Sequence, residues 1–524
     1  MQVGGLSLRS HSAIRVLVVS AVLLAVRWRM GIGPAGDWLL RVFLLTAISG
    51  SVLTWFRFLL STIGGADSYG YVSASQAIAS GRLIEPAPIA DWLSAANKLA
   101  LASPLGWAPA ADGSGIVPTY PIGVSMVMAA FSWIGGANAV FLVSPLMALV
   151  TLVVVYRFAR DWFDPLVAML AVTIVAWNPV FIAYAKQPMS DMAAATWLTL
   201  AMFLALRTSD RSAVWAGVAA GAAVITRPVL LLAAAIVPLT ANRTDATSNR
   251  AILAGMGVAI GVLIQATLQS QLFGSPFSTG YGAGGSIFST SYYATNVGIF
   301  ARQLWTALGF IWLAGLFVGL QVTPAPLRSR MLLIAVPAIL PYLFWLPFDH
   351  WETLRFFLPA LVPLSIVVAA GLLHVARLVQ KPAVTIALVA GFVIPLIGRS
   401  ETLLRQSSAW DIATLEERYP LAGDWLNVNT PPNSVALANQ HSGSLRWYGK
   451  RQTLRWDFLE PQQLTTAVSE LEAHGATVYV ALEGDEVAMF DQRFKDVIGE
   501  LQVDHVGRVR NVSFRRLRYL PPNK

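Results

Sequence analysis

The feature that most constrains this chain is the recurrence of long apolar segments along its first three quarters. Runs of about 17 to 25 apolar residues are long enough to cross a bilayer as helices. Hydrophobic residues make up 56% of the 524 residues and charged residues only 12%, whereas soluble domains carry about 25% charged residues. The pattern predicts a polytopic α-helical membrane protein with about 11 transmembrane helices.

Basic residues cluster in short loops between the apolar runs, and such clusters mark the cytoplasmic side of a membrane protein. The spans are predicted near residues 38–60, 138–156, 165–185, 191–206, 213–226, 229–241, 251–272, 302–320, 331–347, 356–376 and 382–398. Two apolar segments are too short to fit this alternation: 14–26 is expected at the inner interface and 121–134 on the outer face. The net charge of +9 therefore reflects membrane orientation and does not indicate a nucleic-acid surface.

The chain is expected to have three parts. Residues 1–37 form a cytoplasmic or interfacial segment, residues 38–399 the transmembrane domain with a long outer loop at 61–137, and residues 400–524 a small α/β domain on the outer side. In that last part, residues 434–439 and 477–482 read as short buried strands. The amphipathic segment 461–475 between them reads as a helix that Gly475 ends.

The stretch IGGADSYGYVSAS, residues 63–75, follows the first span and presents Asp67 and Tyr69 in a glycine-rich loop. Glycines allow the backbone to approach a ligand closely. A carboxylate beside apolar protein and lipid can act as a general base. The structural alternative is that Asp67 caps a helix or closes a turn, where Asp is common.

A second acid, Asp191, opens the predicted span at 191–206. Ser190 or Asp191 would make a good helix N-cap, which is a sufficient structural explanation for either residue. Lys186 precedes them by about one turn and is either an anion-binding candidate or a solvated helix end.

A third cluster lies in FDHWETLRFFLPALVPL, where His350, Glu352 and Arg355 gather at the outer end of a span. Arginine can bind a phosphate through two parallel hydrogen bonds. The alternative is interfacial anchoring, with Arg355 reaching to the headgroups. Weaker phosphate-binding candidates by the same argument are Arg82, Lys98 and Arg227.

Metal and nucleotide sites have little support in the sequence. There is no Asp-X-Asp, no His pair at helical spacing, no cysteine and no glycine-rich nucleotide motif. A divalent cation, Mg²⁺ or Mn²⁺, held by Asp67 and other outer carboxylates stays open.

The order of these segments resembles the GT-C superfamily of membrane glycosyltransferases. The resemblance covers roughly residues 38–400 and is to the branch of the protein O-mannosyltransferases and the aminoarabinose transferases of lipid A modification. It rests on the acid after the first span and on the segments TYPIG, NAVFLVSPLMALVTLVVVYRFARDWF, NPVFIAYAKQPMSDMAAATWLTLAM and LRFFLPALVPL.

The resemblance implies a sugar donor linked to a polyprenyl phosphate, used at the outer face of the membrane. It implies that Asp67 is the catalytic base, that Asp191 matches the family's later acid, and that Arg355 loosely matches the residue that meets the lipid phosphate. Many members have a second acid next to the base. This sequence has Ser68 there, which puts metal binding in doubt.

The predicted activity is inverting transfer of a sugar to a hydroxyl of a lipid, glycan or protein acceptor. The protein is expected in the inner (plasma) membrane, with its active site and C-terminal domain outside the cytoplasm. The alternatives are a transporter and a noncatalytic envelope-assembly protein. A transporter would need charged residues near mid-membrane, whereas the acids here lie at the ends of the predicted spans.

Overall fold

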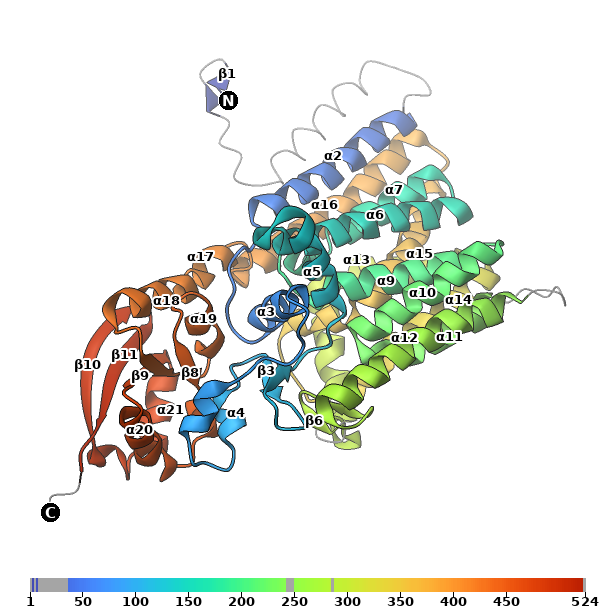
Figure 1. Cartoon of the computed structure of the whole chain (residues 1–524). Helices are drawn as coiled ribbons and strands as arrows, with labels where there is room; N and C mark the ends of the chain where they lie inside the picture. Colours follow the sequence, from blue (N-terminus) through green and yellow to red (C-terminus); the bar gives the residue numbers. More distant parts are fainter. Residues whose placement is uncertain (1, 4–5, 8–35, 242–248, 284–286, 522–524) are drawn as a thin grey trace. The chain divides into compact units, whose positions relative to one another are not determined.

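The computed structural model describes residues 2–3, 6–7, 36–241, 249–283 and 287–521 (Figure 1). The interfacial segment predicted at 14–26 lies outside these residues. The chain divides into two compact units. Unit 1 comprises Met1–Leu59, Ser144–Ile264 and Ile287–Trp410, and unit 2 comprises Leu60–Val143, Gln265–Ser286 and Asp411–Lys524.

In its described residues unit 1 consists mainly of helices, and near the N-terminus β1 (Gln2–Val3) pairs with β2 (Leu6–Ser7). Its α-helices are α2 (Gly36–Arg57), α6 (Val143–Trp162), α7 (Pro165–Ala176), α8 (Pro179–Ala185), α9 (Ser190–Ala205), α10 (Asp210–Thr226), α11 (Leu231–Ala241), most of α12 (Arg250–Phe273), α13 (Tyr293–Val322), α14 (Ala325–Ile339), α15 (Leu358–Arg377) and α16 (Pro382–Gln406). Short 3-10 helices lie at η3 (Pro228–Leu230), η5 (Thr290–Tyr292), η6 (Leu340–Phe344) and η7 (Trp351–Phe357).

Local sequence explains where several of these helices begin. The Asp164 side chain accepts hydrogen bonds from the backbone of Leu166 and Val167, and Pro165 occupies the first position of α7. Asn178 and Pro179 begin α8 in the same way. A polar cap followed by proline is a strong helix start, because proline lacks the N–H that would otherwise be unsatisfied.

All eleven segments predicted as spans contain helix. Among the described residues seven helices are long and apolar enough to cross a membrane, or eight if α7 and α8, which bend by 66°, form one broken span. The segments 191–206, 213–226 and 229–241 correspond to α9, α10 and α11, which have 16, 17 and 11 residues. These three are short for an independent span, so the number that cross stays a prediction.

Glycines allow α10 and α12 to pack closely. A methyl group added at Gly217 or Gly221 would overlap the backbone of α12, and one added at Gly257 or Gly261 would overlap α10. Both helices therefore present a Gly-x-x-x-Gly face to each other, an arrangement common between membrane helices because small residues let backbones approach.

Helix α13 is broken at Gly309, which has φ +73°. A break in a membrane helix leaves carbonyl groups without partners, and these must be satisfied inside the protein. The Arg399 side chain in α16 does so, because its Nε donates to the Thr306 carbonyl at 2.9 Å and its Nη2 to that of Trp305.

Unit 2 combines the segment after α2 with the C-terminal region. The first part holds α3 (Asp67–Ala79), η1 (Pro88–Trp92), α4 (Lys98–Ala102), β3 (Trp107–Pro109), β4 (Ile116–Pro118), α5 (Gly123–Gly135) and η2 (Ala137–Leu142), and the middle segment holds the strands β5 (Ser278–Thr279) and β6 (Gly282–Ala283). The C-terminal region holds α17 (Ile412–Glu416), α18 (Arg418–Asn429), β7 (Ser434–Leu437), α19 (Ser442–Trp447), β8 (Gln452–Leu454), η8 (Trp456–Phe458), α20 (Gln463–Ala473), β9 (Thr477–Glu483), α21 (Glu486–Arg493), η9 (Ile498–Glu500), β10 (Leu501–Val509) and β11 (Val512–Tyr519).

The C-terminal strands form one mixed sheet in the order β10-β11-β9-β7-β8. Strand β7 is parallel to both β8 and β9, whereas β11 is antiparallel to both β9 and β10. The predicted strands at 434–439 and 477–482 are confirmed as β7 and β9, and the predicted helix at 461–475 as α20. Gly475 has φ +77°, the left-handed conformation that suits the end of a helix.

Candidate functional site

Asp67 lies in the first turn of α3, half-buried, beside a group of tyrosines in unit 2. The Tyr120 hydroxyl makes a side-chain hydrogen bond with the Asp67 carboxylate. Burial raises the pKa of Tyr120, and the charge of Asp67 raises it further. The hydroxyl therefore stays protonated and donates to the carboxylate. The Tyr120 ring also lies 4.9 Å from that of Tyr71 and 5.9 Å from that of Tyr281.

Asp67 does not cap α3. The position before the helix is Ala66, and no side chain caps it. Ser68 holds the loop instead, because its hydroxyl donates to the Gly64 carbonyl at 2.6 Å and accepts from the Gly64 amide at 3.0 Å. The capping alternative for Asp67 is therefore wrong, and its carboxylate faces Tyr120.

The glycines of this loop make room for the protein's own aromatic rings. A methyl group at Gly64 would overlap the Tyr419 ring, and one at Gly70 would lie 2.6 Å from carbon atoms of the Tyr120 ring. Close approach of the backbone was expected from the sequence. Here the partner of Gly64 and of Gly70 is a tyrosine of the chain, which packs α3 within unit 2.

Tyr69 and Arg82 line a cavity in the same unit. The Tyr69 ring packs on Gly443, where an added methyl group would overlap it. Burial raises the pKa of Tyr69, although the nearby Arg446 guanidinium acts to lower it. Arg82 is exposed and lies 3.6 Å from the Glu85 carboxylate.

Asp191 lies inside unit 1 and pairs with Arg227. Its carboxylate is 1% exposed and lies 2.5 Å from Nη2 of Arg227, whose side chain is 11% exposed. Nε of Arg227 also donates to the Ser190 hydroxyl at 3.3 Å. No side chain caps α9, which begins after Met189. The capping explanation for Ser190 or Asp191 is wrong, because Asp191 is one member of a buried ion pair.

Two guanidinium groups share one aromatic ring in unit 1. Arg227 lies 5.4 Å and Arg355 5.2 Å from the centre of the Phe356 ring, and Arg355 also lies 5.5 Å from that of Tyr184. The Phe356 ring also stacks on that of Tyr342 at 4.7 Å and lies 6.2 Å from that of Trp345. These rings hold both arginines by cation–π attraction.

Lys186 is completely buried in unit 1. Its ammonium group donates to the Ala409 carbonyl and lies 4.8 Å from the centre of the Trp410 ring. The expectation of a solvated helix end is wrong, because the carbonyl and the ring replace water around the charge.

His350 is exposed and Glu352 is half-buried at the start of η7. Their side chains are 62% and 38% exposed, and Nδ1 of His350 lies 3.6 Å from the Glu352 carboxylate. The two therefore lie together in unit 1, near in sequence to Arg355.

The described residues contain no group of three His, Asp or Glu side chains that could hold a metal ion. Near Asp67 the neighbouring donor groups are the hydroxyls of Ser68 and Tyr120, and both are used in hydrogen bonds within unit 2. This donor set does not suit Mg²⁺ or Mn²⁺, which prefer several carboxylate or carbonyl oxygens.

Sequence reasoning missed two residues that complete these clusters. Tyr120 is the tyrosine of TYPIG, and its place in a motif of the outer loop was the available signal. Phe356 directly follows Arg355, but nothing local indicates that Arg227 would lie over the same ring.

A family model described as dolichyl-phosphate-mannose-protein mannosyltransferase matches residues 119–268. The match begins one residue before Tyr120 and includes Asp191 and Arg227. No curated protein matches the chain in sequence.

The chain is similar in structure to ArnT from Cupriavidus metallidurans bound to undecaprenyl phosphate. The TM-score is 0.57 at 12% identity, over 92% of this chain and 98% of that chain. For the same protein in the apo state the TM-score is 0.56 at 12% identity, over 90% and 97% of the two chains. The oligosaccharyltransferase of Archaeoglobus fulgidus in the apo form is more distant, with a TM-score of 0.49 at 13% identity over 87% and 72%. The fold and the family match confirm the predicted resemblance to the GT-C superfamily of membrane glycosyltransferases.

Proposed function

We propose that this protein transfers a sugar from a polyprenyl-phosphate donor to an acceptor hydroxyl, with Asp67 as the general base. The observation that carries the proposal is the half-buried Asp67 carboxylate at the start of α3, oriented by the Tyr120 hydroxyl. A carboxylate held in one orientation can take a proton as the acceptor oxygen attacks.

The reaction is a single displacement at the anomeric carbon. The acceptor oxygen forms the new bond to that carbon while the bond from the carbon to the phosphate oxygen breaks. The electron pair of the broken bond stays with the polyprenyl phosphate, and the acceptor proton moves to Asp67. Attack from the face opposite the leaving group inverts the anomeric configuration.

The leaving phosphate gains negative charge, which a preorganised cation can stabilise. Arg227 and Arg355, held around Phe356, are the proposed phosphate ligands, since guanidinium groups suit the geometry of an oxyanion. ArnT, which shares the fold, binds undecaprenyl phosphate. Asp191 is proposed to position Arg227 through their buried ion pair.

The other predicted site residues receive more limited roles. His350 and Glu352 are proposed to contact the polar part of the donor or acceptor, because they are at least partly exposed and close in sequence to Arg355. Lys186 is proposed to act through its charge, since its ammonium group is already held by the Ala409 carbonyl. No step of this reaction passes through a metal ion.

The protein is a multi-pass membrane protein. We propose that it lies in the inner (plasma) membrane with Asp67 and the C-terminal sheet outside the cytoplasm. Because the chain has no cysteine, a single introduced cysteine is the only site in this protein that a maleimide labels. With a membrane-impermeant maleimide, intact cells should label Glu460→Cys, an exposed position in unit 2, and spare Ser329→Cys, an exposed position between two arginines. The reverse labelling would contradict this orientation.

Turnover of the donor tests the activity. The purified protein in lipid discs is offered a panel of polyprenyl-phosphate sugars with a membrane extract as acceptor source, and release of polyprenyl phosphate is followed. We expect one donor to turn over and Asp67→Asn to lose the activity. The matched control is Asp91→Asn, because Asp91 is an acid of the same unit with a side chain that is 79% exposed.

The outcomes separate the parts of the proposal. If folded protein releases polyprenyl phosphate from no donor, the transferase activity is wrong and the transport or assembly alternatives gain support. If Asp67→Asn keeps the activity, the enzyme stands and Asp67 is not its base.

A further inference from the structure

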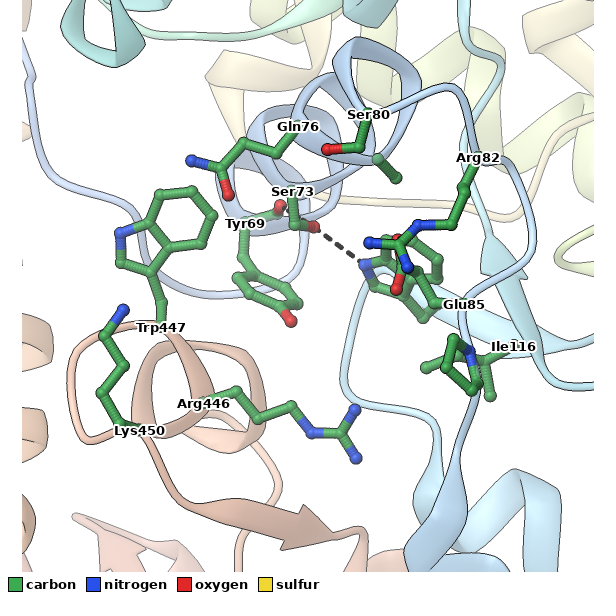
Figure 2. A pocket seen from close by; sticks show the side chains of 13 residues that line it. Tyr69, Ser73, Gln76, Ser80, Arg82, Glu85, Ile116, Arg446, Trp447 and Lys450 are labelled. Carbon is green, nitrogen blue, oxygen red and sulfur yellow. Dashed lines mark hydrogen bonds and ion pairs between the residues drawn. The ribbon is translucent and has the colours of Figure 1, made fainter.

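Unit 2 contains a cavity of about 370 Å³. Residues of α3 and the segment after it, of β3 and β4, and of the last turn of α19 with the turn that follows line it (Figure 2). From α3 come Tyr69, Ser73 and Gln76, which are four and three residues apart and so share one helix face. At 3.6 residues per turn, Asp67 and Tyr71 lie on roughly the opposite face of α3. The cavity is therefore separate from the surroundings of the proposed base.

The cavity is rich in positive charge. Its lining includes Arg82, Arg446 and Lys450 and a single acid, Glu85. Glu85 lies 3.6 Å from Arg82, so these two opposite charges offset each other. The net positive charge of the lining therefore comes from Arg446 and Lys450.

Arg446 is held by neutral groups. Its Nε donates to the Thr453 hydroxyl at 2.9 Å, and its Nη2 donates to the carbonyls of Ala102 at 2.7 Å and Thr453 at 3.1 Å. In the described part of the chain no carboxylate forms an ion pair with Arg446 and its Nη1 makes no hydrogen bond. Burial lowers the pKa of Arg446, which reflects the cost of keeping this cation without water, but an arginine remains charged in proteins. An anion in the cavity would satisfy both the charge and the remaining donor.

Lys450 occupies a position that glycine usually takes. Its φ is +51°, in the left-handed region that is unfavourable for a lysine. Such backbone strain is found more often at functional sites than elsewhere. Figure 2 shows Lys450 and Trp447 together on one wall of the cavity.

The remaining lining includes aromatic and polar side chains. Trp447 and Tyr69 present ring surfaces, and the Trp107 indole is fixed by its hydrogen bond to the Ser73 hydroxyl at 2.8 Å. An aromatic ring offers a flat apolar surface to the C–H face of a sugar, and hydroxyl and amide groups such as those of Gln76 suit sugar hydroxyls. The volume lies within the range of about 300–1,000 Å³ of small-ligand sites.

We propose that this cavity binds an anionic sugar unit, with the sugar ring against Trp447 and its carboxylate or phosphate group on Arg446 and Lys450. Binding itself does not depend on the transferase activity. Its use as a docking site for a glycan acceptor, held away from the base, rests on the proposed function.

Binding is measured on the full chain in lipid discs by calorimetry and by saturation-transfer NMR. The probes are glucose 6-phosphate, glucuronic acid, glucose and inorganic phosphate. We expect at least one of the two anionic sugars to bind at least about tenfold more tightly than both glucose and inorganic phosphate, since a charge-assisted hydrogen bond is worth about that factor or more. Whichever anionic sugar binds better identifies the anionic group.

Lys450→Asn should weaken this binding about tenfold, because the charged contact is lost, while the left-handed backbone suits asparagine. The matched control is Arg510→Asn. Arg510 also has a positive φ, +54°, and carries one positive charge in unit 2, but it does not line the cavity. Trp447→Leu should weaken the binding of the sugar ring.

Two results would overturn the proposal. One is binding of glucose, or of inorganic phosphate, as tight as that of the anionic sugars. The other is unchanged binding in both Lys450→Asn and Trp447→Leu. Asp67→Asn should bind as the wild type does, so loss of turnover and loss of this binding are distinguished in the same set of proteins.

Discussion

The buried ion pair between Asp191 and Arg227 allows a quantitative test of the structure of unit 1. The proteins required are Asp191→Asn, Arg227→Met and the double variant. Each single substitution leaves one partner of the pair in an interior that excludes water. The double variant removes both charges, so the free energies of unfolding form a closed cycle that isolates the coupling of the two side chains.

The expected coupling follows from burial and distance. The closest atoms of the two groups are 2.5 Å apart, and their side chains are 1% and 11% exposed. Two unit charges about 4 Å apart attract by about 4 kcal/mol at an effective dielectric constant of about 20. Removing one partner of a buried pair costs about 3–5 kcal/mol. We therefore expect each single variant to lose about 3 kcal/mol and the double variant to lose clearly less than the sum of the two.

An exposed ion pair in the same unit is the control. Asp161 and Arg207 lie 3.0 Å apart with side chains 36% and 50% exposed, so Asp161→Asn should cost no more than about 1 kcal/mol. The free energies are measured by denaturant titration in mixed micelles. Two results would refute the inference that burial makes the Asp191–Arg227 pair strong. One is a double variant whose loss in free energy of unfolding equals the sum of the two single losses. The other is a loss in Asp161→Asn as large as that in Asp191→Asn.

Three further outcomes are expected. Tyr120→Phe should lower donor turnover about tenfold, less than the roughly 10²–10⁴-fold of full general acid–base assistance, because Asp67 remains and only the hydroxyl that orients it is removed. Unchanged turnover would contradict that role. Burial acts to raise the pKa of Glu483, but its hydrogen bonds and ion pair outweigh this and lower it. The stabilisation that ionised Glu483 contributes is therefore complete above the pKa of the unfolded state, about 4.3, and is lost as the pH falls through the lower pKa of the folded state. Below about pH 4.3 the melting temperature of Glu483→Gln should therefore change less with pH than that of the wild type. Gly443→Ala should destabilise unit 2 by about 1–3 kcal/mol, because the added methyl group would overlap the Tyr69 ring. The control is Gly499→Ala, which has open space around it and should change the free energy of unfolding by less than about 0.5 kcal/mol.

The helical segments of unit 1 were predictable because apolar runs and polar helix starts are local properties of the sequence. Asp164 followed by Pro165, for example, marks the start of α7 without any knowledge of the fold. The environment of Lys186 was not predictable, because the carbonyl that receives its hydrogen bond belongs to Ala409, more than two hundred residues away.

The same limit applies to the sheet. Strands β7 and β9 have apolar interiors and could be recognised, since buried parallel strands read as continuous apolar runs. Strands β10 and β11 were missed because they carry many charged side chains, among them Arg515, Arg516 and Arg518. The sequence also gives no sign that the loop after α2 shares a compact unit with this sheet. In the structure, the Arg455 amide donates to the Leu101 carbonyl at 2.7 Å.

The buried charges of unit 1 bear on function as well as on stability. Replacing a buried ion pair by apolar side chains of similar volume is often neutral or stabilises a protein by about 1–4 kcal/mol, because the cost of removing water from both charges disappears. Asp191→Leu combined with Arg227→Met is therefore expected to fold at least as stably as the wild type. If the guanidinium of Arg227 binds the leaving phosphate, this stable protein will release no polyprenyl phosphate. A protein that is both stable and active would show instead that the pair serves the fold alone and that the phosphate is bound by other cations.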